Sequence, residues 1–187
     1  MRLYNRFLIP IILATVLFGC EARTDQADGG GVLLSITDFD GLPIQVSVNA
    51  TALLAGGFVQ IGDLTIQNIV KDPFGASSSL MDVEIRSYEV TYTRADSGTR
   101  VPPTLVRGLF GTVPAGGTFQ VTNLPVMTIQ QIANPPLSDL LFQNGSRDRE
   151  TGSNIIIINL FLRFFGRTLS GDAVETAPAA FTIEFVP

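Results

Sequence analysis

The sequence predicts an all-β protein, a sandwich of two sheets with about seven to nine strands. The chain is rich in Val, Ile, Thr and Phe, residues that strands favour. Its 18 Gly and 11 Pro supply turn signals about every ten residues, a spacing typical of a sandwich or a barrel. Several segments alternate apolar and polar residues, and we find no strong amphipathic helix and no internal repeat. A small closed β-barrel is the alternative architecture.

Short runs of β-branched and apolar residues between the turn signals are the expected strands. In residues 43–50, Ile44, Val46 and Val48 alternate with polar residues, so this strand has one apolar and one polar face. The sequence Asp38-Phe39-Asp40-Gly41 is the expected turn before it. The expected strands are 32–37, 43–50, 58–70 (with a break at Gly62-Asp63), 81–94, one beside Pro102-Pro103, 118–123, 154–165 and one that contains Phe181, Ile183 and Phe185.

The segment 81–94 predicts a β-bulge. Its apolar residues change phase along the strand: the first phase holds Val83 and Ile85, and the second holds Tyr88, Val90 and Tyr92. Because side chains alternate with period two, the phase changes only where an extra residue is inserted, here near Arg86-Ser87. Tyr88 and Tyr92 are interpreted as core residues, with a stacking platform for a sugar or a peptide as the alternative.

Residues 154–165 predict a central strand with two different faces. One face is wholly apolar and consists of Ile156, Ile158, Leu160, Leu162 and Phe164. The other face is mixed and carries Phe161 and Phe165, which we predict as an interface for a partner. The alternative is that the region 125–142 covers these two rings.

The region 125–142 is expected to be irregular. Pro135-Pro136 excludes a long helix there, and a short helical turn is expected at 129–133 or 137–141. Residues 143–154 form the longest polar loop of the sequence.

The first nineteen residues have the pattern of a secretory signal. Arg2 and Arg6 are the only charges before Cys20, and thirteen uncharged residues follow Arg6. A transmembrane helix needs about 20 apolar residues, so this run, which also contains Pro10, is too short to span a bilayer. We therefore exclude residues 1–19 from the folded domain.

The sequence Leu17-Phe18-Gly19-Cys20 resembles the lipobox of bacterial lipoproteins. Leu17, Gly19 and Cys20 match the aliphatic, small and cysteine positions, whereas Phe18 is bulkier than the usual Ala or Ser. The resemblance implies that the Cys20 thiol receives a diacylglyceryl group and that the signal is cleaved between Gly19 and Cys20. It also implies that the new amino group is often acylated, and two or more chains anchor a protein stably to a membrane.

The lipoprotein resemblance explains the single cysteine of the chain and suggests a location. In enteric bacteria an Asp after the lipidated cysteine retains the protein in the inner membrane, but here Glu21 follows Cys20. The resemblance therefore implies the outer membrane, facing the periplasm, in a cell that has one. We expect a signal peptide at 1–19, an acylated cysteine and flexible tether at 20–31, and a single β-sandwich domain at 32–187.

The predicted domain also resembles the immunoglobulin-like and fibronectin-like domains of exported bacterial lipoproteins, in architecture only. The Cys…Trp…Cys pattern of true immunoglobulin domains is absent, since the chain has one Cys and no Trp. This resemblance carries no functional residues to the mature chain.

Composition excludes several functional classes. Without Arg2 and Arg6, ten basic residues face seventeen acidic ones, and the net charge of −7 argues against a nucleic-acid partner. The chain has no His, which excludes Ser-His-Asp and Cys-His catalysis and His-based metal sites. We therefore predict no catalytic residues, no metal and no cofactor.

Three groups of acidic residues are weaker candidates for a site. Asp38, Asp40 and Gly41 resemble the start of a calcium loop, but Asn49 stands where the bidentate Glu is needed, so a hairpin turn is expected. The charged residues 148–150 are expected in a solvated loop, with a cation site as the alternative. The third group is expected on an exposed strand face, with glycoside chemistry as its alternative, and consists of Asp82, Glu84 and Glu89.

The leading functional prediction is a lipid-anchored envelope lipoprotein whose sandwich is a binding or structural module and not an enzyme. The first alternative is a hydrolase that uses carboxylates in place of His. The second is an adhesin or envelope-assembly subunit whose partner pairs with an edge strand or contacts Phe161 and Phe165.

Overall fold

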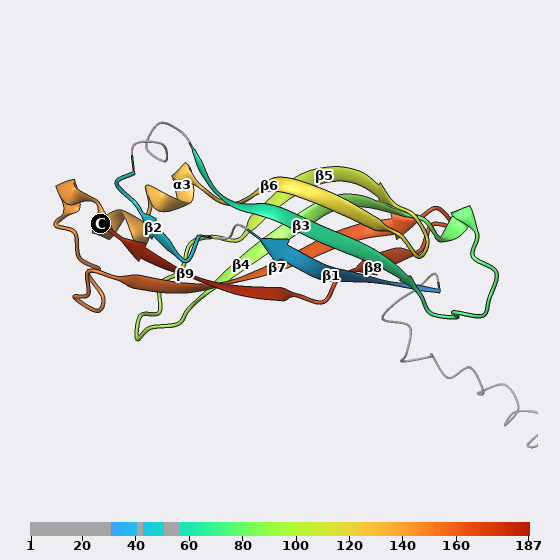
Figure 1. Ribbon diagram of the computed structural model, residues 1–187. Coiled ribbons are helices and arrows are strands. Elements are labelled where there is room, and N and C mark those ends of the chain that lie inside the picture. The colour runs from blue at the N-terminus through green and yellow to red at the C-terminus, as the bar shows by residue number, and fades with distance from the viewer. Residues whose placement is uncertain (1–30, 41–42, 51–56) are drawn as a thin grey trace, which may run out of the picture.

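The computed structural model describes residues 31–40, 43–50 and 57–187, which form a protein made almost entirely of β-strands (Figure 1). It is an all-β sandwich with a barrel-like curl, which confirms the predicted fold class. The strands are β1 (Val32–Asp40), β2 (Gln45–Ser47), β3 (Phe58–Val70), β4 (Val83–Arg94), β5 (Leu105–Val113), β6 (Thr118–Thr128), β7 (Ile156–Thr168), β8 (Ala173–Glu175) and β9 (Ala179–Val186). The short helices are η3 (Ser79–Met81), α3 (Ile129–Ile132), η4 (Leu137–Leu140) and η5 (Phe142–Asn144).

The strands form two sheets. One sheet has the order β1-β3-β6 and is antiparallel. The other has the order β2-β9-β7-β4-β5, with β8 paired to the end of β7, and only its β2–β9 pair is parallel. The central strand β7 buries its apolar face as predicted, through Ile156, Ile158, Leu160, Leu162 and Phe164.

Connections on both sides curl the sheets toward each other. On one side Leu34 of β1 bridges to Thr176, whose backbone N–H donates to the Phe164 carbonyl at 3.0 Å. On the other side β5 and β6 are joined by the predicted turn, in which Gly117 N donates to the Pro114 carbonyl at 2.8 Å. The sandwich therefore shares features with the barrel alternative.

The structure confirms the predicted bulge in β4. The pairing of β4 with both neighbouring strands shifts between Ile85 and Ser87. Both phases of β4 therefore face the core, and its buried residues are Val83, Ile85, Tyr88, Val90 and Tyr92. Gly166 lies opposite the bulge, where an added Cβ would stand 2.6 Å from the Glu84 carbonyl oxygen. Only glycine allows the two backbones to approach this closely.

Three expectations for the first strands are wrong. The break expected at Gly62-Asp63 is absent, because β3 runs without interruption from Phe58 to Val70. β1 continues through Asp40, because Asp38, Phe39 and Asp40 pair with Thr65, Leu64 and Asp63 of β3. Phe39 also packs edge-on against Phe181, with ring centroids 4.7 Å apart. Gly41, the end of the expected turn, lies outside the described residues. In 43–50 only Gln45–Ser47 pairs as a strand, and Ile44 is exposed although the alternation predicted it on the apolar face.

The region 125–142 is more ordered than expected. β6 extends to Thr128, and both predicted helical turns are present as α3 and η4. α3 begins with a capping box in which Thr128 and Gln131 exchange hydrogen bonds. Ile132, Leu137 and Leu140 are fully buried, so this region closes one end of the core.

The strands run along the molecule and define two ends, which Figure 1 shows at its right and left. At one end Lys71 N donates to the Gly31 carbonyl at 3.0 Å, beside the connections 71–82, 114–117 and 168–172. At the other end lie α3, η4, η5, the C-terminus and the loop 95–104. We call these the Gly31 end and the loop end.

Candidate functional sites

The two predicted interface residues lie on the outer face of β7. Phe161 stands opposite Thr91 of β4 and Ala180 of β9, and Phe165 stands opposite Ser87 of β4. Both rings are partly exposed on the side of the sheet that faces away from the core. Phe165 also stands opposite Glu175 of β8, so the cross-strand neighbours of both rings are small or polar.

The region 125–142 does not cover these rings, so that alternative is wrong. It packs on the core side of β4, where Tyr88 Oη donates to the Pro125 carbonyl at 2.7 Å and Tyr92 Oη to the Val126 carbonyl at 2.6 Å. Cross-strand partners point to the same face of a sheet, which puts both tyrosines on the face opposite to Phe161. Tyr88 and Tyr92 are core residues, as predicted.

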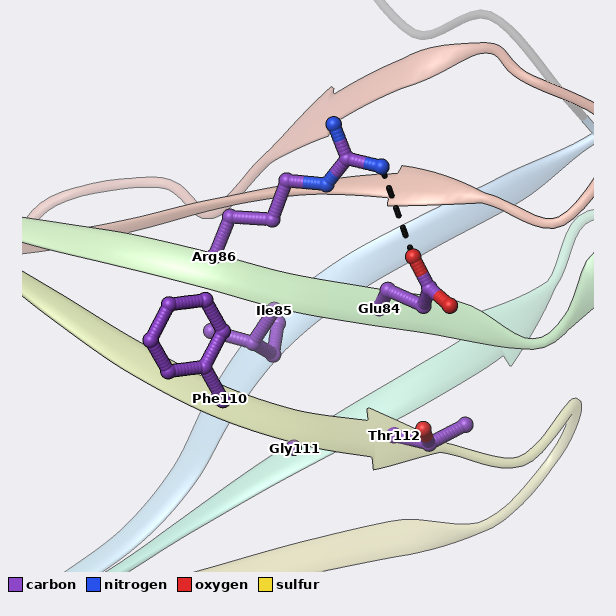
Figure 2. A pocket seen from close by; sticks show the side chains of 6 residues that line it. All are labelled: Glu84, Ile85, Arg86, Phe110, Gly111 and Thr112. Carbon is purple, nitrogen blue, oxygen red and sulfur yellow. Dashed lines mark hydrogen bonds and ion pairs between the residues drawn. The ribbon is translucent and has the colours of Figure 1, made fainter.

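A hollow of about 460 Å³ lies on the outer face where β4 and β5 run past the bulge (Figure 2). Phe110 is 84% exposed beside it, and Glu84 and Arg86 form an ion pair of 3.4 Å across its rim. A smaller hollow of about 220 Å³ lies next to Phe161. An exposed ring beside an ion pair offers contact area to a partner.

The loop end holds a group of ion-paired side chains that the sequence did not reveal. We call it the charged cluster, and it consists of Arg94, Asp96, Arg100, Asp139, Asp148 and Glu150. The Arg94 guanidinium, buried at the end of β4, donates to both oxygens of Asp96 at 2.6 and 2.9 Å and to Asp148 Oδ2 at 2.8 Å. Asp148 is buried too, so its expected place in a solvated loop is wrong.

Arg100 links the charged cluster to two further segments. Its Nη2 donates to Asp139 Oδ2 in η4 at 3.0 Å and to Asp148 Oδ1 at 3.3 Å. The Glu150 carboxylate accepts from the backbone N–H groups of Thr99 and Arg100 at 2.8 and 3.1 Å. The cluster thus ties the loop 95–104, η4 and the polar loop 143–154 together.

The protonation behaviour of the charged cluster follows from its contacts. Burial acts to raise the pKa of Asp148, but hydrogen bonds from Arg94, from the Thr151 hydroxyl and from the Glu150 N–H outweigh it and lower the pKa to about 2. Burial also opposes ionisation of Asp96, and the hydrogen bonds from Arg94 again leave its pKa lowered. These carboxylates remain ionised throughout the neutral range.

A second buried polar group lies beside the cluster. Gln131 Nε2 donates to Tyr92 Oη at 3.1 Å and to the Pro103 carbonyl at 2.6 Å. Burial is the main cause that raises the pKa of Tyr92. The tyrosine hydroxyl therefore stays protonated and acts as a bridge between β6 and α3.

Three aspartates lie close together on the outer face of the three-stranded sheet. Asp40 of β1 stands directly opposite Asp63 of β3, Asp38 stands opposite Thr65, and a hollow of about 320 Å³ lies among them. All three carboxylates are exposed. Among the residues that the structure describes, no group of three or more His, Cys, Asp or Glu side chains is arranged to hold a metal ion.

Asp82, Glu84 and Glu89, the weaker candidates for a catalytic site, have different surroundings. Asp82 Oδ1 accepts from the Ala115 N–H at 2.9 Å and so fixes the turn at 114–117. Glu84 lies on the exposed face, as predicted, and it forms an ion pair with Arg86 there. Glu89 borders the hollow beside Phe161.

The lipobox residues Leu17, Phe18, Gly19 and Cys20 lie outside the described residues. Across 31–40, 43–50 and 57–187, the structure has no helix of the length and hydrophobicity that crossing a membrane requires.

Comparison with known proteins gives no family for this chain. No family model matches it, and no curated protein matches it. A solved structure, the X-ray structure of Northeast Structural Genomics Consortium target SoR45, is similar over 81% of this chain and 81% of its own, with 11% sequence identity and a TM-score of 0.35.

Proposed function

We propose that the chain is a lipoprotein of the bacterial cell envelope, anchored by acyl chains on Cys20, and that its sandwich is a binding or structural module rather than an enzyme. The proposal starts from the lipobox-like Leu17-Phe18-Gly19-Cys20 and the polar stretch 21–30 that follows it. The proposed location is the outer membrane, facing the periplasm, in a cell that has one.

The position of Gly31 is the observation that carries this proposal. Gly31 lies at one end of an elongated sandwich, and the C-terminus and the helical segments α3, η4 and η5 lie at the other (Figure 1). A tether that enters at Gly31 directs the loop end away from the membrane. Binding residues concentrate on loops that a rigid scaffold positions, so the loop end is the proposed display surface.

The contacts of the charged cluster support a non-enzymatic role. Asp139 and Asp148 are buried, and their oxygens accept hydrogen bonds from Arg94, Arg100 and backbone N–H groups. A general acid or base needs a pKa near the working pH, whereas that of Asp148 is about 2. These carboxylates hold loops in place.

A second candidate function is that of an envelope-assembly subunit. The observation that favours it is the open outer face of β7, where Phe161 and Phe165 are partly exposed beside hollows of about 220 Å³. Partly exposed aromatic side chains are enriched in protein interfaces. In this candidate the partner contacts the side of the sandwich and not its loop end.

The anchor is tested by mass spectrometry of the N-terminal peptide from protein expressed in a bacterial host. We expect a peptide that begins at Cys20 and carries a diacylglyceryl group and an acylated amine. The Cys20→Ala variant is the control, and we expect it to keep residues 1–19 and to lack acyl chains. An unmodified Cys20 in the wild-type protein would refute the proposal.

The choice between the two functions is tested by chemical crosslinking in intact envelopes. If the assembly candidate is correct, one partner crosslinks in stoichiometric amount to the wild type and is lost in the Phe161→Ser/Phe165→Ser double variant. Phe142→Ser is the matched control, because Phe142 is also exposed but lies at the loop end. Loss of the partner in the control instead would assign binding to the loop end.

A further inference from the structure

An aromatic side chain is displayed at the tip of the Gly31 end. Phe74 is 98% exposed. It lies in a tight turn, since Gly75 N donates to the Asp72 carbonyl at 3.2 Å and Phe74 N donates to Asp72 Oδ1 at 3.0 Å. Phe74 therefore presents an apolar ring to the surroundings of the domain.

Two further apolar side chains are exposed at the Gly31 end. Leu80 in η3 is 58% exposed and Leu169 is 46% exposed. Their segments are joined by backbone hydrogen bonds, from Ser170 N to the Leu80 carbonyl at 3.0 Å and from Leu169 N to the Asp82 carbonyl at 2.9 Å. The apolar side chains thus come from two connections that lie side by side.

Gly31, the first residue that the structure describes, lies at the same tip. Leu33 and Ile69, the second residue pair of β1 and β3, stand opposite each other and are also exposed. Gly31 precedes them, and an added Cβ on Gly31 would lie 3.4 Å from the Met81 side chain. Both the apolar tip and the entry of the chain therefore occupy the Gly31 end.

The length of chain before Gly31 limits how far this end can lie from the anchor. Ten residues separate Cys20 from Gly31. Ten residues span at most about 35 Å when fully extended, and about 17 Å on average as a flexible coil. A tether of this length keeps the Gly31 end next to the membrane, and contact between them becomes an intramolecular event that needs little affinity of its own.

We propose that the Gly31 end docks on the bilayer that holds the lipid anchor, with Phe74, Leu80 and Leu169 at the boundary between headgroups and acyl chains. This inference rests on the proposed acylation of Cys20. Asp72 accepts hydrogen bonds within its own turn, and Asp172 accepts from the Ser170 hydroxyl at 2.8 Å. Apolar contact, and not charge, therefore holds the tip to the bilayer.

The absence of Trp from the chain makes the docking directly measurable. Phe74→Trp introduces a single fluorescent reporter at the tip. Phe142→Trp is the matched control, because Phe142 is 71% exposed in η5 at the loop end. Leu169→Trp is a second reporter at the tip. Each full-length, acylated variant is placed in vesicles of zwitterionic phospholipid, with or without bromine on the acyl chains as a quencher.

We expect the Trp emission of the Phe74→Trp and Leu169→Trp variants to be mostly lost in brominated vesicles. The Phe142→Trp variant should keep its emission. Raising the salt concentration should leave the quenching unchanged, since screening weakens charge contacts and not apolar ones.

Two further measurements on the same samples separate this inference from the proposed function. Flotation with the vesicles and the mass of the N-terminal peptide report the anchor, whereas quenching reports the docking. If the protein floats and the Phe74→Trp emission is equal in the two vesicle types, the docking is refuted and the anchor stands. Equal quenching in the Phe74→Trp and Phe142→Trp variants also refutes it. If the protein neither floats nor carries acyl chains, both proposals fail.

Discussion

At the Gly31 end the connections are joined by backbone hydrogen bonds, such as those from Ser170 N to the Leu80 carbonyl and from Leu169 N to the Asp82 carbonyl. At the loop end, by contrast, residues far apart in the sequence meet through the side chains of one ion-paired cluster. The turn at Phe74 is closed by hydrogen bonds from Phe74 N and Gly75 N to Asp72. The charged cluster joins Arg94 to Asp148, 54 residues away. The comparison teaches that the shape of the loop end depends on charged side chains, while at the Gly31 end an exposed side chain such as Phe74 can vary at little cost in stability.

Removing the Arg94 side chain is the strongest test of whether the charged cluster stabilises the loop end. Arg94→Ala leaves the buried carboxylate of Asp148 without its main partner, and we expect a loss of about 3–5 kcal/mol in the free energy of unfolding. Urea denaturation measures it. The matched control is Arg86→Ala, whose ion pair with Glu84 is exposed, and this change should cost at most about 1 kcal/mol. Equal costs would mean that the cluster does not stabilise the fold.

The pH dependence of stability tests the same cluster with a smaller expected effect. Hydrogen bonds hold the pKa of Asp148 at about 2 in the folded protein, below the unfolded value of about 3.9. A lowered folded pKa contributes stability that is complete above the unfolded pKa and is lost as the pH falls toward the folded one. We therefore expect the unfolding free energies of wild type and Asp148→Asn to converge by about 2 kcal/mol between pH 7 and pH 2. A constant difference would contradict this.

Tyr92→Phe tests whether the neutral hydrogen bonds beside the cluster also matter. The change removes the bond to the Val126 carbonyl and leaves Gln131 Nε2 without one of its two acceptors. We expect a loss of about 1–2 kcal/mol, since buried polar groups that lose a partner are costly. Tyr88→Phe is the control, because the bond from the Tyr88 hydroxyl to the Pro125 carbonyl is only partly buried, and thermal unfolding should rank it as the milder change.

Local alternation predicted much of the sandwich. The bulge in β4 followed from two incompatible phases, and the buried face of β7 followed from five apolar residues at alternate positions. Both signals arise within one strand and need no knowledge of what packs against it. The turn expected from Asp38 onward was wrong, because pairing with β3 across the sheet continues β1 through Asp40, and a turn-like sequence does not reveal that partner.

The charged cluster was not predictable in the same way. Asp148 lies in a polar run whose composition predicts a solvated loop. Its burial depends on the guanidinium groups of Arg94 in β4 and Arg100 in the loop after it. The close spacing of Arg94 and Asp96 at the end of a strand was the one local hint. Alternation placed Phe161 and Phe165 on the outer face of β7, where they lie, because a central strand exposes one face wherever no other layer covers it. Their role as an interface stays a prediction.

The smallest expected effect lies at the other end of the molecule. Phe74→Ala removes a ring that is 98% exposed and leaves both hydrogen bonds of its turn, which are made by backbone N–H groups and Asp72, intact. We expect the unfolding free energy to change by no more than about 0.5 kcal/mol in urea denaturation. A larger loss would mean that the ring packs against the domain in solution. A change within this limit means that the fold does not need an aromatic residue at this tip, so a role for Phe74 has to come from what the tip contacts outside the domain.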